Sequence, residues 1–480
     1  MRRLTLLASM PLLAVLPLSS GCATNPVTGE RQLALISESQ EIQMGQEAAV
    51  QAAQSIGLVE DAALQSYVAR IGSTMAAQSE RPDLPWSFQV VDDPTPNAFA
   101  LPGGPIFVTR GILALMGSEA ELAGVLGHEI GHITARHSVT LLSRAQLAQL
   151  TLGVGSILVP EIAQLGQLAG AGLQLLFLSY GRDAERQADD LGFGYALRQN
   201  YDVREMVNMF AQLQRASQAA GQSPLPTWLA SHPYPEERIE RIQQALATLN
   251  QDLSGTKKNV DVYMNRIDNL VYGDNPRAGF FEGGLFLHPD LRFRMQFPQG
   301  WQTQNLAQSV SALSPQKDAV IQLTLAQGSE TQAANQFFGQ QGIASSQVSR
   351  TTINGFPAVT GYFQGQTQDG VVAGVAAFIS FENRTYQILS FTPAQQLQRY
   401  DQLFRSVVGS FDRLTDSRAL NVQPNRISIV RPSQAMTLEE FNRRYPSRID
   451  IAELALINQL QDGNSRIPAG TPVKRIVTGQ

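Results

Sequence analysis

Two histidines and a glutamate lie close together in the segment His128-Glu129-Ile130-Gly131-His132. Each residue of an α-helix turns about 100°, so His128 and His132 are separated by about 40° and can direct imidazole nitrogens at the same ion. Glu129 lies about 100° from His128, which favours a base that takes a proton from a metal-bound water over a third ligand. The spacing therefore predicts a zinc site with a carboxylate base.

Two glycines, Gly127 and Gly131, accompany this motif. They would weaken a helix that serves only for packing, whereas their missing side chains leave room for another element or a substrate to approach. The alternative interpretation is an amphipathic helix whose histidines are satisfied by hydrogen bonds alone. The sequence contains only five histidines, so a chance occurrence of the motif is improbable.

A catalytic zinc site needs a third protein ligand and one open position. His137 follows His128 by nine residues, which places it on the opposite face of a continuous helix, and we interpret it as structural. Glu185 and Asp189 share a helix face at one-turn spacing. Glu185 is the better candidate ligand, and Asp189 can accept the second ring N–H of a ligating histidine. From the residues alone, a charged surface helix explains this segment equally well.

Two further segments fit hydrolysis of peptides. Asn97-Ala98-Phe99 precedes a strand, and an exposed edge strand binds an extended peptide through main-chain hydrogen bonds; an ordinary loop is the alternative. His232 lies between Ser231 and Pro233, with Arg238 at the start of the next helix. His232 can stabilise an oxyanion or occupy the fourth metal position, and Arg238 can also steady the oxyanion. A lone histidine before proline is otherwise a loop residue.

The elements around these residues predict a mostly helical domain with a small sheet, over residues 22–250. Helical spacing of apolar residues predicts two helices within 42–75, one from 118 to about 150, and others at 182–199 and 236–249. Trp86 to Val91 and Ile106 to Val108 have the composition of strands.

The second half of the chain has a different pattern. Residues 251–262 resemble a polar linker. Strand-like alternation over 263–415, with a helical stretch near 394–411, predicts an α+β sandwich domain. Residues 421–480 form a third, smaller unit, so the whole chain is of the α+β class.

The N-terminus predicts export. Met1-Arg2-Arg3 precedes an apolar run and small residues that end at Cys22, so residues 1–21 are interpreted as a signal peptide. Cys22, the only cysteine, is the predicted lipid attachment site, which would tether the protein to a membrane on the periplasmic side of a bacterial cell envelope. A plain signal peptide with an incidental cysteine is the alternative.

Residues 145–181 form a second apolar stretch with few charges. Pro160 and Glu161 interrupt it, which favours a buried or membrane-touching helical pair over a membrane span. The net charge of −5, without a concentrated basic stretch, excludes nucleic acid as a partner.

These motifs together resemble the HtpX-like and CAAX-prenyl-endopeptidase-like zinc metallopeptidases. Asn25 to Gly29, and Ile36-Ser37 with Glu41, are similar to the opening of the exported BepA-like and LoiP-like members. The resemblance implies a gluzincin fold that binds one zinc ion per chain, with protein or peptide substrates and a role in quality control of exported proteins. It also implies the site: the ligands are His128, His132 and Glu185, and the general base is Glu129.

Residues 427–473 are similar to a LysM module, of βααβ order, through Thr437 to Phe441, Leu454 to Asn458 and Ile467 to Pro472. The resemblance implies binding of peptidoglycan glycans, and docking of envelope assembly proteins remains an equal alternative. A rival interpretation of the whole chain is an envelope scaffold or chaperone whose metal site is closed or vestigial.

Overall fold

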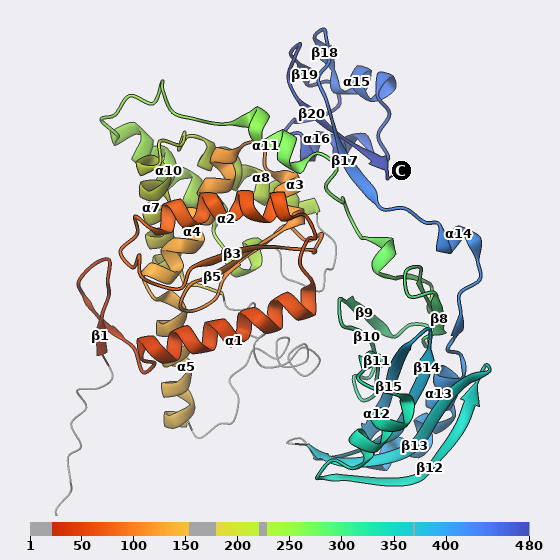
Figure 1. The fold of residues 1–480 in the computed structure, drawn as a ribbon. Coiled ribbons are helices and arrows are strands. Elements are labelled where there is room, and N and C mark those ends of the chain that lie inside the picture. Colours follow the sequence, from red (N-terminus) through yellow and green to blue (C-terminus); the bar gives the residue numbers. More distant parts are fainter. Residues whose placement is uncertain (1–21, 153–178, 220–227, 368–369, 480) are drawn as a thin grey trace, which may run out of the picture.

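The computed structural model describes residues 22–152, 179–219, 228–367 and 370–479 (Figure 1). The predicted signal peptide and most of the apolar stretch 145–181 lie outside the described residues. Within the described ranges, every helix is too short or too polar to cross a membrane.

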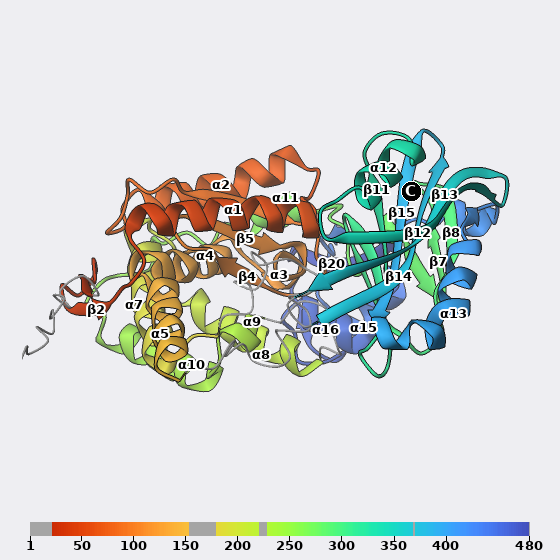
Figure 2. The ribbon, with the colours of Figure 1, turned by 90° about the horizontal axis from the view of Figure 1, so that it is seen from below.

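A helical domain surrounds a small sheet, as predicted. The sheet has the order β3-β5-β4, in which β3 and β5 are parallel and β4 is antiparallel to β5. Helix α4 lies at the centre of the domain with all its residues buried, and it contacts α2, α7, α8 and β4 (Figure 2). The elements are α1 (Glu38–Ile56), α2 (Ala62–Ala76), β3 (Ser87–Val91), β4 (Ala98–Ala100), β5 (Pro105–Thr109), α3 (Arg110–Leu115), α4 (Glu119–Thr134), α5 (His137–Leu152), α7 (Arg182–Arg198), α8 (Glu205–Ala219), α9 (Trp228–Ser231) and α10 (Pro235–Thr248).

Helix α4 begins and ends at residues that explain its length. The Ser118 side chain accepts a hydrogen bond from the Glu121 backbone N–H, a cap for the first turn. The predicted continuous helix to about residue 150 is wrong, because Arg136 takes a left-handed conformation with φ 59° and α5 starts afresh. Buried bonds from Arg136 Nε to Glu41 Oε2 (2.9 Å) and from Nη2 to the Ile36 carbonyl (3.1 Å) stabilise this conformation.

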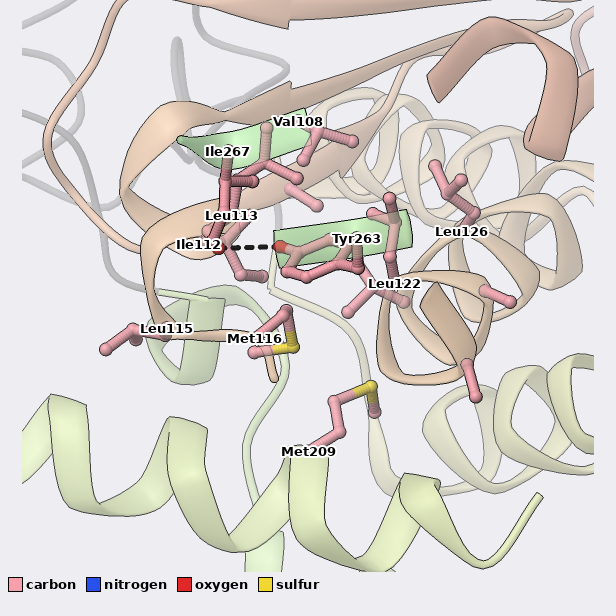
Figure 3. Close-up of a cluster of buried hydrophobic side chains, with 14 of the residues drawn as sticks. Val108, Ile112, Leu113, Leu115, Met116, Leu122, Leu126, Met209, Tyr263 and Ile267 are labelled. Carbon is pink, nitrogen blue, oxygen red and sulfur yellow. Dashed lines mark hydrogen bonds between the residues drawn. The ribbon is translucent and has the colours of Figure 1, made fainter. Parts of the chain in front are cut away.

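The helical domain continues past the predicted boundary at residue 250. Helix α11 (Val260–Ile267) packs into its core, where Tyr263 donates a 2.6 Å hydrogen bond to the Leu113 carbonyl (Figure 3). Met264 and Ile267 share the buried face of the same helix. Residues 251–262 are therefore packed rather than a free linker, and the chain leaves this domain only after residue 267.

The middle domain is the predicted combination of sheets and helices. Its seven-stranded antiparallel sheet has the order β12-β13-β14-β15-β11-β10-β9. Alternate residues of β14 face opposite sides: Phe378 packs with α12, whereas Ala377 packs with α13 and a four-stranded sheet, β16-β8-β7-β6. The elements are β6 (Phe280–Glu282), β7 (Leu285–His288), β8 (Phe293–Gln296), β9 (Gln302–Leu306), β10 (Ser309–Leu313), β11 (Val320–Ala326), α12 (Glu330–Phe338), β12 (Ile343–Ile353), β13 (Phe356–Thr367), β14 (Gly370–Phe381), β15 (Arg384–Pro393), α13 (Leu397–Gly409) and β16 (Asp412–Arg413).

The C-terminal module is docked on the helical domain. β17 (Asn425–Val430), α15 (Leu438–Arg444), α16 (Ile451–Ile457) and β20 (Val473–Thr478) follow one another, with β17 antiparallel to β20, and β18 (Met436–Thr437) pairs with β19 (Arg466–Ile467). The buried Lys474 ammonium donates to the carbonyls of Ala114, Met116 and Ile457, each at 2.7 Å. Apolar residues of the module belong to the same core cluster as those of the helical domain.

Candidate metal centre and active site

Four buried side chains direct one ligand atom each at a common point. The ligand atoms of His128, His132, Glu185 and His232 lie within 4.8 Å of one another. His128 Nε2 lies 3.0 Å from His132 Nε2, and the Glu185 carboxylate oxygens lie 3.6 and 3.5 Å from these two nitrogens. Ligands about 2.0–2.1 Å from a tetrahedral zinc ion are about 3.3 Å apart. The spacing of the three predicted ligands fits this ion.

The protonation states of the histidines agree with metal binding. Burial lowers the pKa of both His128 and His132 well below the usual range, and the cationic Arg238 lowers the His128 pKa further. Both rings are therefore neutral at pH 7, as ligands must be. A cation between the two Nε2 atoms would accept both lone pairs.

Helix α7 reaches the motif because two glycines let it approach. A Cβ added to Gly131 would lie 3.0 Å from Ala188 Cα, and one added to Gly127 would lie 3.0 Å from Gly192 Cα. Since α7 occupies this room, the glycines serve a neighbouring element rather than a substrate. This contact brings Glu185, on the first turn of α7, to the two histidines.

Asp189 lies one turn further along α7 and contacts the first histidine. Its Oδ1 is 2.9 Å from His128 Nδ1, so it can hold the tautomer whose Nε2 is free to bind a metal. Arg238 donates to both Asp189 oxygens at 2.6 and 2.8 Å, and its Nη1 lies 3.0 Å from Glu185 Oε2. The guanidinium lies over the ring of Trp228, 4.5 Å from its centroid. Arg238 thus contacts the candidate ligand Glu185 directly and His128 through Asp189.

His232 occupies the fourth corner of the cluster. Its Nδ1 is 3.1 Å from both His128 Nε2 and Glu185 Oε1. Burial lowers its pKa, but the carboxylates of Glu185 and Glu129 outweigh this effect and raise the pKa above the usual value. Of the two predicted roles, the geometry fits the fourth metal position.

Glu129 lies beside the ligands, as expected of a base. Its Oε1 accepts a 3.1 Å hydrogen bond from Trp228 Nε1, while Oε2 has no hydrogen-bond partner among the described residues. Burial raises the pKa of this carboxyl. One oriented oxygen and one unengaged oxygen suit a group that binds and moves a proton.

Two residues that position the site, Trp228 and Tyr180, had no predicted role. Trp228 lies between Glu129 and Arg238, and the ring of Tyr180 stacks on His132 at 4.0 Å between centroids. The prediction that His137 lies on the opposite helix face is wrong: the break at residue 136 places its Nδ1 2.8 Å from His132 Nδ1. The four-residue spacing from Trp228 to His232 was the only signal for Trp228 in the sequence.

The predicted substrate-binding segment contains an end strand with buried side chains. β4 forms one edge of its sheet, but Asn97, Ala98 and Phe99 are each at most 5% exposed. The expectation of an exposed strand is wrong for the side chains, because α4 covers β4 and Phe99 stacks on Phe107. The predicted lipidation site, Cys22, is the first residue of strand β1 (Cys22–Thr24), which forms a two-stranded antiparallel sheet with β2 (Arg31–Leu33).

Comparisons with known proteins match the same part of the chain. Residues 62–246 match the model of peptidase family M48. The β-barrel assembly-enhancing protease of Yersinia pestis is 33% identical over 252 residues, which cover 49% of this chain and 51% of that protein. The mitochondrial metalloendopeptidase OMA1 of Schizosaccharomyces pombe is 34% identical over 184 residues, covering 38% and 52% respectively. The Escherichia coli assembly-enhancing protease is 31% identical, covering 49% and 50%.

The chain thus spans about half the length of the curated relatives it matches. The matched region contains the helix with both histidines, the helix with Glu185, and His232 with Arg238. Over residues 62–246 this chain is therefore similar to peptidase family M48.

Proposed function

We propose that this protein is a zinc-dependent metalloendopeptidase of the bacterial cell envelope. The observation that carries the proposal is the buried carboxylate of Glu129, with one unengaged oxygen, beside a cluster of donors spaced for tetrahedral zinc. His128, His132 and Glu185 would hold the ion. When bound, zinc supplies Lewis-acid chemistry, which polarises a carbonyl and acidifies a bound water.

The chain's own residues supply the proton chemistry and the positioning. Glu129 Oε2 takes a proton from the attacking water and delivers it to the leaving amine nitrogen, so the peptide bond breaks with no net proton change on the carboxylate. Trp228 holds Glu129 through Oε1. Arg238 supports Glu185 and Asp189, so we assign it to positioning in place of the oxyanion contact predicted from sequence.

For catalysis, the substrate must occupy the fourth corner of the cluster, beside His128, His132 and Glu185. In the structure His232 occupies it, so we propose that this is a closed form and that His232 moves before substrate binds. An extended peptide would then pair with the outer edge of β4, next to Asn97, Ala98 and Phe99.

Substrates and location extend the proposal. Relatives named as β-barrel assembly-enhancing proteases support a role in quality control of misassembled envelope proteins. Lipid attachment at Cys22 would tether the protein to a membrane. The LysM-like order of the C-terminal module supports binding to peptidoglycan or to assembly proteins.

Replacement of the base tests the function. Glu129→Gln is expected to retain one zinc per chain but to lose casein cleavage by at least about 100-fold, the lower range for a general base. Zinc is measured by atomic absorption and cleavage by peptide release. Equal activity in the wild type and the variant would remove Glu129 from its role.

A closed scaffold or chaperone is the second candidate, and the position of His232 favours it. His232→Ala separates the two candidates. Faster cleavage by the variant supports a peptidase restrained by His232. A wild type and a variant that both bind zinc and cleave nothing would support the scaffold.

A further inference from the structure

A large cleft separates the helical domain from the middle domain. It has a volume of about 1830 Å³, above the range of roughly 300–1,000 Å³ that is usual for small-ligand sites. Two contacts border it: Ala307 N–H donates to the Ser55 carbonyl (3.1 Å), and Arg110 Nη1 donates to the Gly273 carbonyl.

Strand edges line this cleft. β9 ends the seven-stranded sheet and β6 ends the four-stranded sheet. Four successive residues of β9, Thr303 to Leu306, line the cleft, and so do Phe280 and Phe281 of β6. Since β9 and β6 end their sheets, each pairs with a neighbouring strand on one side only. Such edges offer N–H and C=O groups to an extended chain of any sequence.

The cleft also exposes apolar side chains. Leu58 is 38% exposed on the helical-domain side, and Leu325 of β11 is 52% exposed on the opposite side. Lining groups of both charge signs, such as Asp61 and Arg266, give no strong preference for a charged ligand. This combination suits an unfolded segment, which presents both backbone and apolar groups.

The cleft is continuous in sequence with the proposed active site. Its lining includes Pro94 and Thr95, and the chain then passes through Pro96 and Asn97 into β4. The Pro96 carbonyl accepts a 3.0 Å hydrogen bond from the backbone N–H of Trp228, which holds Glu129. A peptide paired with β4 and continuing past Asn97 is thus directed toward the cleft.

We propose that this interdomain cleft is a second binding site for substrate, which holds an extended, unfolded polypeptide segment through the edges of β9 and β6 and through Leu58 and Leu325. The site rests on the proposed peptidase function and deepens it: the substrate class is unfolded protein, and the middle domain selects it. Short peptides would reach the metal centre without this contact.

The test compares two substrates of different length. Leu58→Glu combined with Leu325→Glu places charge at two exposed positions, and Val348→Glu is the matched control, an exposed apolar residue (45%) on β12 at the other end of the sheet. We measure kcat/KM for reduced, carboxymethylated α-lactalbumin and for a ten-residue peptide. The kcat/KM for the unfolded protein, divided by the kcat/KM for the peptide, is expected to fall at least tenfold in the double variant. In the control this ratio is expected to stay at the wild-type value.

Binding without cleavage keeps the two proposals separable. In the full chain with Glu129→Gln, fluorescence anisotropy measures binding of the same labelled, unfolded protein. At least tenfold weaker binding on adding the two leucine substitutions supports the cleft, even if no cleavage is found in the wild type. An unchanged Kd and an unchanged substrate ratio would overturn it. Leu58→Gln with Leu325→Gln repeats the test if the glutamate variants melt at lower temperature than the control.

Discussion

The position of the candidate ligand Glu185 depends on the glycines of α4, which let α7 pack closely against that helix. Gly131 faces Ala188 so closely that a methyl group would meet its Cα at 3.0 Å. We expect Gly131→Ala to push α7 and Glu185 away from the histidines and to lower the free energy of unfolding by about 1–3 kcal/mol. Zinc retention against a chelator and urea unfolding measure the two effects.

A glycine on α7 itself supplies the control. A Cβ at Gly194 meets only Arg198 Nη1, at the ordinary distance of 3.7 Å. Gly194→Ala is expected to stabilise the helix by about 0.5–1 kcal/mol without changing zinc retention. If both alanines behaved alike, the close approach of α7 to α4 would not be what sets the ligand geometry.

Asp189 tests whether the groups behind the ligands matter. Asp189→Asn keeps the size of the side chain but removes the charge that holds His128 and Arg238, so zinc affinity is expected to fall about 10- to 100-fold. Competition with a chelator measures the affinity. Asp190→Asn is the control, because Asp190 forms only an exposed ion pair with Arg241; equal effects of the two variants would contradict the role of Asp189.

At the scale of elements, the helix with the motif was predictable and its end was not. Ser118, the apolar periodicity and the histidine spacing all appear in the sequence. The break at Arg136 does not, because a left-handed arginine is stabilised by Glu41, almost a hundred residues away. His137 was placed on the wrong face for the same reason.

The strand β7 provides a pH test for the middle domain. Burial lowers the pKa of His288 to about 4, and its Nδ1 accepts a 3.2 Å hydrogen bond from Leu291 N–H. The unfolded chain therefore binds more protons between about pH 4 and 6.5, so the contribution of about 3 kcal/mol is complete above pH 6.5 and is lost as pH falls toward 4.

This contribution should disappear in His288→Gln. The difference in free energy of unfolding between wild type and variant, from urea titrations between pH 4 and 7.5, isolates His288 because the other four histidines are present in both proteins. A difference that does not vary with pH would contradict the assignment.

At the scale of the whole molecule, the order of the domains along the chain was predictable. The packing of the C-terminal module into the core of the helical domain was not. The composition changes near residues 263 and 421 suggested separate units. The sequence could not show that α11 and the C-terminal module enter the core of the helical domain, because such contacts join residues far apart in the chain. One such contact joins the module to α4, the helix with the two histidines. Gln459 Nε2 donates a 2.7 Å hydrogen bond to Glu121 Oε2. The neighbouring Asn458 Oδ1 accepts a hydrogen bond from the backbone N–H of Lys474.

The buried lysine predicts strong coupling between the module and the peptidase. Lys474→Met leaves three buried carbonyls without their donor, which is expected to lower the free energy of unfolding by about 3–5 kcal/mol. Zinc should be released at the same urea concentration at which the module unfolds. Arg466→Met, an exposed change in the same module, should stay within about 0.5 kcal/mol. Zinc release at an unaltered midpoint in Lys474→Met would show that the domains are independent.

The shared core also bears on when, during synthesis of the chain, the metal centre can form. Strand β20 completes the packing around α3 and the start of α4, yet it is made long after α10. At roughly 5–20 residues per second, a nascent chain spends on the order of tens of seconds with both histidines made and their support missing. We therefore expect the metal centre of the proposed peptidase to be complete only after β20 has been synthesised.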